Sequence, residues 1–496
     1  MLVTINRNRT LWEALLPAEC LEMSAELVAV DRLLDDPVFF EPYRQFFDPI
    51  WGRPSIPVET YLRLMFLKAR HGLSFEAVVR EAADSLSWRR FCRVPLGERM
   101  PHPTTLMKTT KRCGESTVEA LNEALLAKAV AAHVVKSDKV RVDTTVVEAN
   151  VAYPTDSGLM AKGVAKMAGI VRTLQQMGLA TRTKARDRTR SMRRRAHAIG
   201  AWLRRRSDDA KDEVKAINAE MATITETALI EARRVAANAA RSLRQAGVEA
   251  SGKALALVAD LQETAELLER VVTQTRLRLA GQTPDGATRV VSLHDRDARP
   301  IAKGRLGRPV EFGYKAQVAD NVDGIVVDYH VVIGNPGDAG LLPGAIERIK
   351  ARLGRAPGAV AADRGYADAK TETALEALGV KTIAIPRNGR PGAARQKVER
   401  QRGFRRLVKW RTGCEGRISH LKHGFGWNRT MIDGLAGAQT WCGLGILAHN
   451  AIKIADLIET NNQPGRPLET ATTGRRPRQR AGADPPPEPP PPLSAP

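Results

Sequence analysis

Three carboxylates in this sequence have the residue type and the setting that metal-dependent chemistry requires. Asp143 lies in VRVDTTVVEA, a run rich in Val and Thr that alternates as a β-strand does, and Asp363 closes the apolar run GAVAAD. Glu415 lies on a later segment with helical spacing. If the strands share a sheet and the helix packs across it, the three carboxylates converge on one point. An oxygen-only cluster of this kind suits Mg²⁺ or Mn²⁺ and is a poor zinc site.

The neighbours of Glu415 make it the most informative of the three carboxylates. On a helix, Arg411 lies about 40° and Lys422 about 20° from it, so that the three side chains share one stripe. A metal-binding carboxylate flanked by cations for phosphate suits in-line phosphodiester displacement, in which two ions about 3.5–4 Å apart stabilise the entering and leaving oxygens. An ordinary surface ion-pair ladder has the same spacing and is the alternative.

The two aspartates also have ordinary structural interpretations. Asp143 fits a surface charge on an edge strand, but it interrupts a strand whose neighbours have buried character, where an unpaired carboxylate is costly. Asp363 precedes Arg364-Gly365-Tyr366 and fits a turn or a helix N-cap equally well. Spacing alone therefore leaves the role of Asp363 open.

A helical pattern precedes the first strand, over residues 53–135. Pro57 suits a first helical turn, and Ser74 suits the N-cap of a second helix. Ser116 and Glu119 have the spacing of a capping box before a third helix. The pattern predicts a compact helical domain whose exposed basic residues either bind DNA or form a solvated face.

Strand patterns resume at Glu311. The runs EFGYKAQVAD and IVVDYHVVIG predict two strands joined by a tight turn that contains Asp323-Gly324. GAVAAD and VKTIAIPR predict two short strands on either side of a helix at residues 369–378, and a further helix is expected at residues 404–423.

Long helical patterns rich in Ala, Glu, Leu and Arg separate the first strand from the later ones. The stretch TRTKARDRTRSMRRRAHAIGAWLRRR holds ten arginines and one aspartate. Such a basic helix either clamps the DNA backbone or forms a solvated arm, and the scarcity of acids favours the clamp. The candidate DNA-binding residues of this segment are Arg193, Arg194, Arg195, Arg204 and Arg205.

Composition limits the class of protein. The 496 residues carry a formal net charge of +22, which favours a polyanionic partner, and nucleic acid fits best. A ribosome-associated or merely soluble basic protein is the alternative. No membrane span or export signal is recognisable, and the five scattered cysteines are expected to be reduced thiols, so we expect a cytoplasmic, nucleoid-associated protein.

Taken together, these segments resemble the bacterial insertion-sequence DDE transposases over roughly residues 10–456. RPSIPVETYLRLMFLKARHGLSFEAVVREAADSLSWRRFC is similar to the helical domain that precedes their catalytic core. VRVDTTVVEANVAYPTDSGL is similar to the segment with their first aspartate, and VVIGNPGDA followed by VAADRGYAD to the region of the second. RLVKWRTGCEGRISHLKHGFGWNRT resembles their Tyr-x2-Arg-x3-Glu-x6-Lys signature, except that Val408 takes the place of the tyrosine.

The resemblance implies a fold class and a division into domains. We expect an α/β RNase H-like catalytic domain at residues 136–460, with a mixed five-stranded sheet flanked by helices, the first aspartate on the first strand and the second on the fourth. An all-helical N-terminal domain at residues 1–135 would bind the transposon ends, and a long basic helical insertion would occupy residues 159–285. The Pro-rich residues 461–496 lack apolar side chains and are expected to be disordered.

The resemblance also implies the activity, which is metal-dependent cleavage of double-stranded DNA at terminal inverted repeats and strand transfer into target DNA. Asp143, Asp363 and Glu415 would be the catalytic residues and the ligands of Mg²⁺ or Mn²⁺, with two ions per site. Arg411 and Lys422 would position phosphates, and a homodimer or larger assembly would pair the two ends.

Three alternatives stay open at this stage. A nuclease of the same fold would hydrolyse DNA without strand transfer, and an inactive or domesticated DNA-binding protein would keep the fold alone. The three intact carboxylates argue against the inactive protein. An architectural nucleoid protein would show no cleavage at all.

Overall fold

The computed structural model of the chain describes residues 1–3, 15–205, 208–246, 251–305 and 308–462. The predicted Pro-rich tail lies outside this part from residue 463 onward. Helices before the first strand are short except for the last. Their bounds are η1 Ala18–Leu21, α2 Ala25–Leu34, η2 Pro37–Phe39, α3 Glu41–Arg44, α4 Val58–His71, α5 Phe75–Asp84, α6 Leu86–Phe91 and α7 Pro103–Ala131.

Local signals account for several of these helix ends. Ser74 caps α5, because its side chain accepts a hydrogen bond from the Ala77 amide as predicted. Pro57 is the N-cap residue of α4 rather than part of its first turn. The helix expected near Ser116 is the second part of α7, which begins after a break at Gly114, where φ is 61° and ψ is −155°.

The described part of the chain forms one six-stranded sheet, and the expected number of five is corrected. Its strands are β1 Lys139–Glu148, β2 Arg299–Arg305, β3 Arg308–Asn321, β4 Val326–Ile333, β5 Ala359–Ala361 and β6 Thr382–Ala384. The sequence RPIAKGR of β2 does not alternate in polarity and contains Pro300 and Gly304, so its pattern does not predict a strand. β2 pairs with the first half of β3.

The sheet is mixed, and β3 and β1 lie at its centre. β3 is antiparallel to β1 and to β4, whereas β5 is parallel to β1 and β6 is parallel to β5. The strands therefore run in the order β4–β3–β1–β5–β6. The predicted turn between β3 and β4 is present, since the Asn321 side chain accepts hydrogen bonds from the amides of Asp323 and Ile325 and Gly324 has a φ of 81°.

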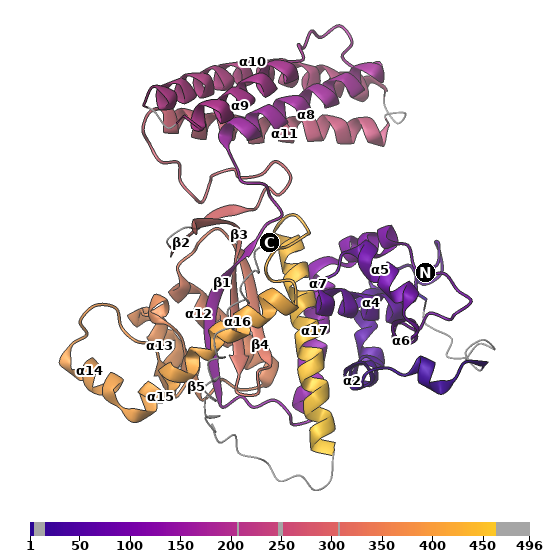
Figure 1. Ribbon diagram of the computed structural model, residues 1–496, viewed down its shortest axis with the longest axis vertical. Helices are drawn as coiled ribbons and strands as arrows, with labels where there is room; N and C mark the ends of the chain where they lie inside the picture. Colours follow the sequence, from indigo (N-terminus) through magenta and orange to yellow (C-terminus); the bar gives the residue numbers. More distant parts are fainter. Residues whose placement is uncertain (4–14, 206–207, 247–250, 306–307, 463–496) are drawn as a thin grey trace, which may run out of the picture.

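Helices of the second half of the chain cover the sheet. They are α12 Asp338–Leu353, η4 Arg364–Tyr366, α13 Ala369–Ala377, α14 Ala393–Arg400, α15 Arg402–Arg411, α16 Gly413–Gly424 and α17 Leu435–Asn462. The long helix α17 lies between the sheet and the N-terminal helices, and it packs on both α7 and β4 (Figure 1). A single large core accordingly includes residues of the N-terminal helices, the sheet and α17.

Between β1 and β2 the chain leaves the sheet and forms a helical bundle that stands apart from it (Figure 1). The bundle helices are α8 Asp156–Gln176, α9 Thr189–Leu203, α10 Asp208–Ala246 and α11 Gly252–Leu279. They have an apolar core of their own, distinct from that of the sheet. None of the described helices is long and apolar enough to span a bilayer.

Candidate active site

The parallel pairing of β1 with β5 determines where the two aspartates lie. Arg141 is the register partner of Ala361, and each aspartate follows two residues later on its strand or just past its end. Asp143, in the middle of β1, and Asp363, just past the end of β5, therefore lie level with each other on neighbouring strands. The Asp363 side chain also caps η4 by accepting a hydrogen bond from the Gly365 amide, as the turn interpretation expected.

Arg411 lies among the three candidate carboxylates. One terminal guanidinium nitrogen, Nη2, lies 3.0 Å from Asp143 Oδ2 and 3.4 Å from Asp363 Oδ2. The other, Nη1, lies 3.5 Å from Glu415 Oε1. Three carboxylates from distant parts of the sequence thus surround one cation.

Exposure differs strongly among these side chains. The side chain of Asp143 is 12% exposed, that of Asp363 39% and that of Glu415 71%. Burial raises the pKa of Asp143 to about 6, and the negative charges of Asp363 and Glu415 act in the same direction. Arg411 and the Thr144 amide oppose this shift. Asp143 therefore holds a proton more tightly than an ordinary aspartate does.

The single helix expected at residues 404–423 is two helices that meet at Thr412, and this expectation is corrected. Arg141 on β1 donates to the Trp410 carbonyl, and the Thr412 hydroxyl donates to the Lys409 carbonyl. A side chain at Gly413 would collide with the Arg141 guanidinium, because a Cβ atom there would lie 2.1 Å from its Nη1. Arg141 therefore fills the space at the junction, and Arg411 and Glu415 face each other across it.

A buried carboxylate on β3 binds the helix junction to the sheet. Asp320 is fully buried, and it accepts hydrogen bonds from Arg141 Nε at 2.7 Å and from Arg417 Nε at 3.2 Å. Arg141 reaches the end of α15, and Arg417 belongs to α16. Asp320 thus links both helices that carry Arg411 and Glu415, a role that the sequence analysis missed.

A fourth acidic residue, Asp338 at the start of α12, lies beside the site and was also missed. It accepts a hydrogen bond from the Thr144 hydroxyl at 3.1 Å and pairs with Lys315 at 2.6 Å. Burial raises the pKa of Tyr366 well above its usual value, and Asp338 and Asp143 add to that rise. Asp338 belongs to the segment GNPGDA, which precedes Asp363 in the region that resembles the family.

The other predicted DNA-binding residues lie elsewhere. Lys422 is half-buried on α16. The five arginines of the basic stretch belong to α9 and its end in the bundle, where Arg195 pairs with Glu220 at 2.8 Å. The remaining four, Arg193, Arg194, Arg204 and Arg205, are exposed.

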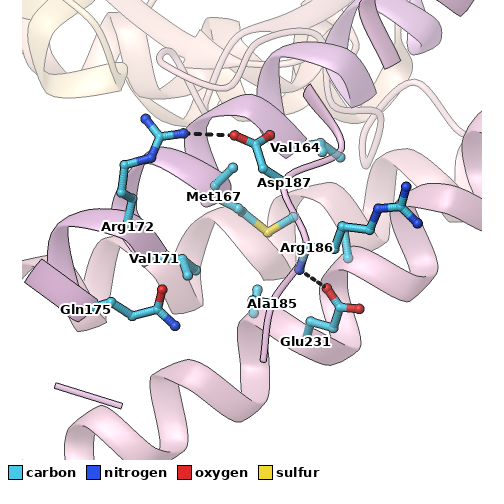
Figure 2. Close-up of a pocket in the computed structure, with 12 residues that line it drawn as sticks. Val164, Met167, Val171, Arg172, Gln175, Ala185, Arg186, Asp187 and Glu231 are labelled. Atoms are coloured by element: carbon cyan, nitrogen blue, oxygen red, sulfur yellow. Dashed lines mark hydrogen bonds and ion pairs between the residues drawn. The ribbon is translucent and has the colours of Figure 1, made fainter. Parts of the chain in front are cut away.

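The bundle contains a pocket between α8, α10 and the segment before α9 (Figure 2). Its polar lining residues bind one another: Arg172 pairs with Asp187 at 2.8 Å, and Glu231 accepts a hydrogen bond from the Arg186 amide at 2.9 Å. None of the candidate catalytic residues lines it. The pocket is therefore a feature of bundle packing, separate from the carboxylates.

The donor set around Arg411 is chemically suited to a hard divalent cation. Asp143, Asp363 and Glu415 offer only oxygen ligands, and the site already surrounds the positive charge of Arg411. In the described part of the chain, however, no three acidic, His or Cys side chains are close enough together to hold a metal ion as they stand. Arg411 lies between the carboxylates, so a metal ion would have to replace it.

Comparisons with known proteins identify the family. The family model described as "Transposase domain (DUF772)" matches residues 16–112, and the model described as "Transposase DDE domain" matches residues 276–451. The chain belongs to the insertion-sequence DDE transposases. The family's DDE domain indicates a DNA-cleaving enzyme, and its members bind transposon ends and generally use divalent metal ions.

The two family models match only part of the candidate site of the transposase. Asp363, Arg411 and Glu415 lie within the DDE match, whereas Asp143 and most of the helical bundle lie between the two matches. An uncharacterised protein, ORF8 of the nfe locus of Rhizobium meliloti, is 32% identical over 171 residues, which cover 32% of this chain and 80% of the relative. No solved structure matches.

Proposed function

We propose that this transposase cleaves double-stranded DNA at the ends of its own element and transfers the freed strand into target DNA, with Asp143, Asp363 and Glu415 as catalytic carboxylates. The observation that carries the proposal is their convergence on Arg411 from β1, the end of β5 and α16. The perturbed pKa of Asp143 within this group also supports the proposal, because perturbed pKa values cluster at functional sites.

The strand order supports an RNase H-like catalytic fold. Three antiparallel strands, β4–β3–β1, continue into the parallel strands β5 and β6, and the first aspartate lies on the first strand in sequence. Without β2, the second aspartate follows the fourth strand, as the family resemblance implies. We propose residues 136–460 as the catalytic domain, interrupted by the bundle, and residues 1–135 as the domain that binds transposon ends.

The three carboxylates would hold Mg²⁺ or Mn²⁺, and two such ions stabilise the attacking and leaving oxygens of a phosphodiester displacement. Arg411 would exchange its carboxylate partners for a DNA phosphate, because a guanidinium binds phosphate and carboxylate with the same geometry. The Lys422 side chain on α16 would contribute a second phosphate contact. Two copies of the chain would pair the two ends.

A strand-transfer assay tests this function. Purified transposase is incubated with a labelled DNA that carries the inverted repeats flanking its gene, a target plasmid, and either Mg²⁺ or Mn²⁺. We expect nicked ends and joined products with the wild type and neither product with Asp143→Asn or Glu415→Gln. Nicking without joining would instead favour the nuclease, and binding without nicking would favour the inactive DNA-binding protein.

A further inference from the structure

A helix beside the site carries a row of cations that the candidate DNA-binding residues do not include. Residues 387–411 contain ten Lys and Arg residues and a single acidic residue, Glu399. Glu399 is already engaged, since it pairs with Arg395 at 3.2 Å and accepts a hydrogen bond from the Arg387 amide. Glu372 of α13 pairs with Arg387 and Arg395, and Arg411 contacts the candidate carboxylates. The uncompensated positive charge of the segment therefore lies on its other seven Lys and Arg residues.

Helix α15 has a basic, exposed face and an apolar face that packs on the sheet. Arg402, Arg405, Arg406 and Lys409 follow the spacing i, i+3, i+4, i+7, which places them within an arc of about 100°. All four are exposed, and no acidic side chain in the described part of the chain pairs with any of them. We call these four residues the α15 stripe.

The opposite face of α15 fixes the stripe to the catalytic sheet. Phe404 is buried against Ala361 of β5 and Ala384 of β6, and Leu407 and Val408 pack on the same cluster. Arg411 ends the helix on this inner side, where it contacts the carboxylates. The stripe is therefore held rigidly, and its last member, Lys409, is only two residues from Arg411.

We propose that the α15 stripe binds the phosphate backbone of the DNA duplex that enters the active site. The row extends about 10 Å along the helix axis, since seven residues each rise 1.5 Å. Phosphates of one strand recur about every 3.4 Å along the duplex axis, so the row spans about three of them. Arg411 lies on the opposite face of the same helix, two residues beyond Lys409, so a duplex bound at the stripe passes the end of α15 that carries Arg411. The identity of the partner as DNA rests on the proposed function.

The stripe is separate from the basic helix of the bundle. α15 packs on the edge of the sheet formed by β5 and β6, whereas α9 belongs to the bundle that stands apart from the sheet (Figure 1). A duplex bound only by α9 has no necessary relation to the carboxylates. A duplex bound by the α15 stripe does, because the stripe and Arg411 share one helix.

A charge-matched comparison of DNA binding tests the proposal. One variant combines Arg402→Gln, Arg405→Gln, Arg406→Gln and Lys409→Gln. The control combines Lys350→Gln, Arg355→Gln, Lys370→Gln and Lys381→Gln, four exposed residues outside α15 and the bundle. Affinity for a labelled duplex with the terminal repeats is measured from 50 to 300 mM salt in EDTA, so that no cleavage occurs.

We expect the stripe variant to bind at least about tenfold more weakly than the wild type, with a salt dependence shallower by about 3 units, because each phosphate contact contributes about 0.9. The control should change affinity less than about threefold. Equal losses in both variants, or no loss in the stripe variant, would overturn the proposal. If the stripe variant loses affinity as expected but the wild type never cleaves with Mg²⁺ or Mn²⁺, the proposed function is contradicted and the DNA-binding role of the stripe is supported.

Circular dichroism and thermal melting establish that the variants are folded. Should the fourfold variant unfold, Arg405→Gln and Lys409→Gln are tested singly, each with an expected loss of about one unit of salt dependence. An unchanged slope in both single variants would also overturn the proposal.

Discussion

Asp143 is the least exposed of the three carboxylates, and its protonation links the site to the stability of the protein. Burial raises its pKa to about 6 from the ordinary value of 3.8, so the folded protein binds this proton more tightly than the unfolded chain does. The stabilisation is complete below pH about 4 and is lost as the pH rises through about 6. At neutral pH the ionised side chain therefore destabilises the fold.

We predict that Asp143→Asn stabilises the metal-free transposase at neutral pH, because the amide is neutral at every pH. The two proteins should have nearly equal free energies of unfolding at pH 4, and the variant should be more stable by about 2–3 kcal/mol at pH 7.5. Urea unfolding in EDTA across this range measures the difference, with the exposed Asp138→Asn as control. A variant less stable than the wild type at pH 7.5 would show that the attraction of Arg411 outweighs burial.

Arg411 occupies the point at which a metal ion would bind, and its charge opposes that binding. We predict that Arg411→Gln tightens Mn²⁺ binding by about tenfold in the absence of DNA, or about 1.4 kcal/mol, while it abolishes strand transfer. Electron paramagnetic resonance of free Mn²⁺ measures the affinity. The control, Arg364→Gln, removes an exposed arginine next to Asp363 and should change the affinity less than twofold. Weaker Mn²⁺ binding by Arg411→Gln would contradict this account of the site.

Alternation and turn residues predict β1, the β3–β4 pair, the short strands β5 and β6 and the helix α13. The pattern missed β2 and the division between α15 and α16, since both depend on partners elsewhere in the chain. Arg141 and Asp320 are 179 residues apart in sequence, and no local signal connects them. Helical spacing predicts the pairing of Glu415 with Arg411. The contact of Arg411 with Asp143 joins segments 268 residues apart, so no local pattern predicts it.

Two buried aspartates on neighbouring strands allow the role of Asp320 to be separated from general stability. Asp320 on β3 binds Arg141 and Arg417, whereas Asp328 on β4 binds Arg348 and Arg352 of α12. Both carboxylates are almost fully buried, so each Asp→Asn substitution should destabilise the protein by about 3–5 kcal/mol. Of the two, only Asp320 bonds to a helix of the candidate site, through Arg417 of α16.

We predict that Asp320→Asn loosens α16 and exposes Cys414, a buried thiol next to Glu415. Alkylation by iodoacetamide, followed by peptide mass spectrometry, should be at least about tenfold faster at Cys414 in Asp320→Asn than in the wild type, because opening of α16 becomes more frequent. Cys442 on α17 provides an internal control within the same sample. Asp328→Asn should leave Cys414 unchanged, and equal acceleration in both variants would reduce Asp320 to a general stabilising residue. Arg417→Gln serves if Asp320→Asn does not fold.

The bundle is attached to the sheet through two chain segments whose bundle ends lie close together. Gln274 near the end of α11 donates a hydrogen bond to Asp156 at the start of α8 at 2.8 Å, and Arg278 pairs with the same carboxylate. The apolar cores of bundle and sheet have no residue in common. Each part thus has the interior that independent folding requires.

We predict that the transposase folds without the bundle but binds DNA less tightly. Residues 157–273 are replaced by four Gly and Ser residues, which reach about 13 Å and can join the ends. The shortened protein should still unfold cooperatively, and the salt dependence of DNA binding should fall by about 3–4 units through loss of the exposed arginines. Those arginines are Arg193, Arg194, Arg204 and Arg205.

The full-length chain with these four arginines changed to Gln provides the matched control, because it keeps the bundle and removes only its charge. If the bundle clamps the DNA backbone, the two proteins should show the same shallower salt dependence, and nicking at saturating DNA should persist in both. A shortened protein that binds as tightly as the wild type would show that the bundle has another role. A shortened protein that loses nicking while the arginine variant retains it would show that the bundle positions the catalytic sheet rather than the DNA.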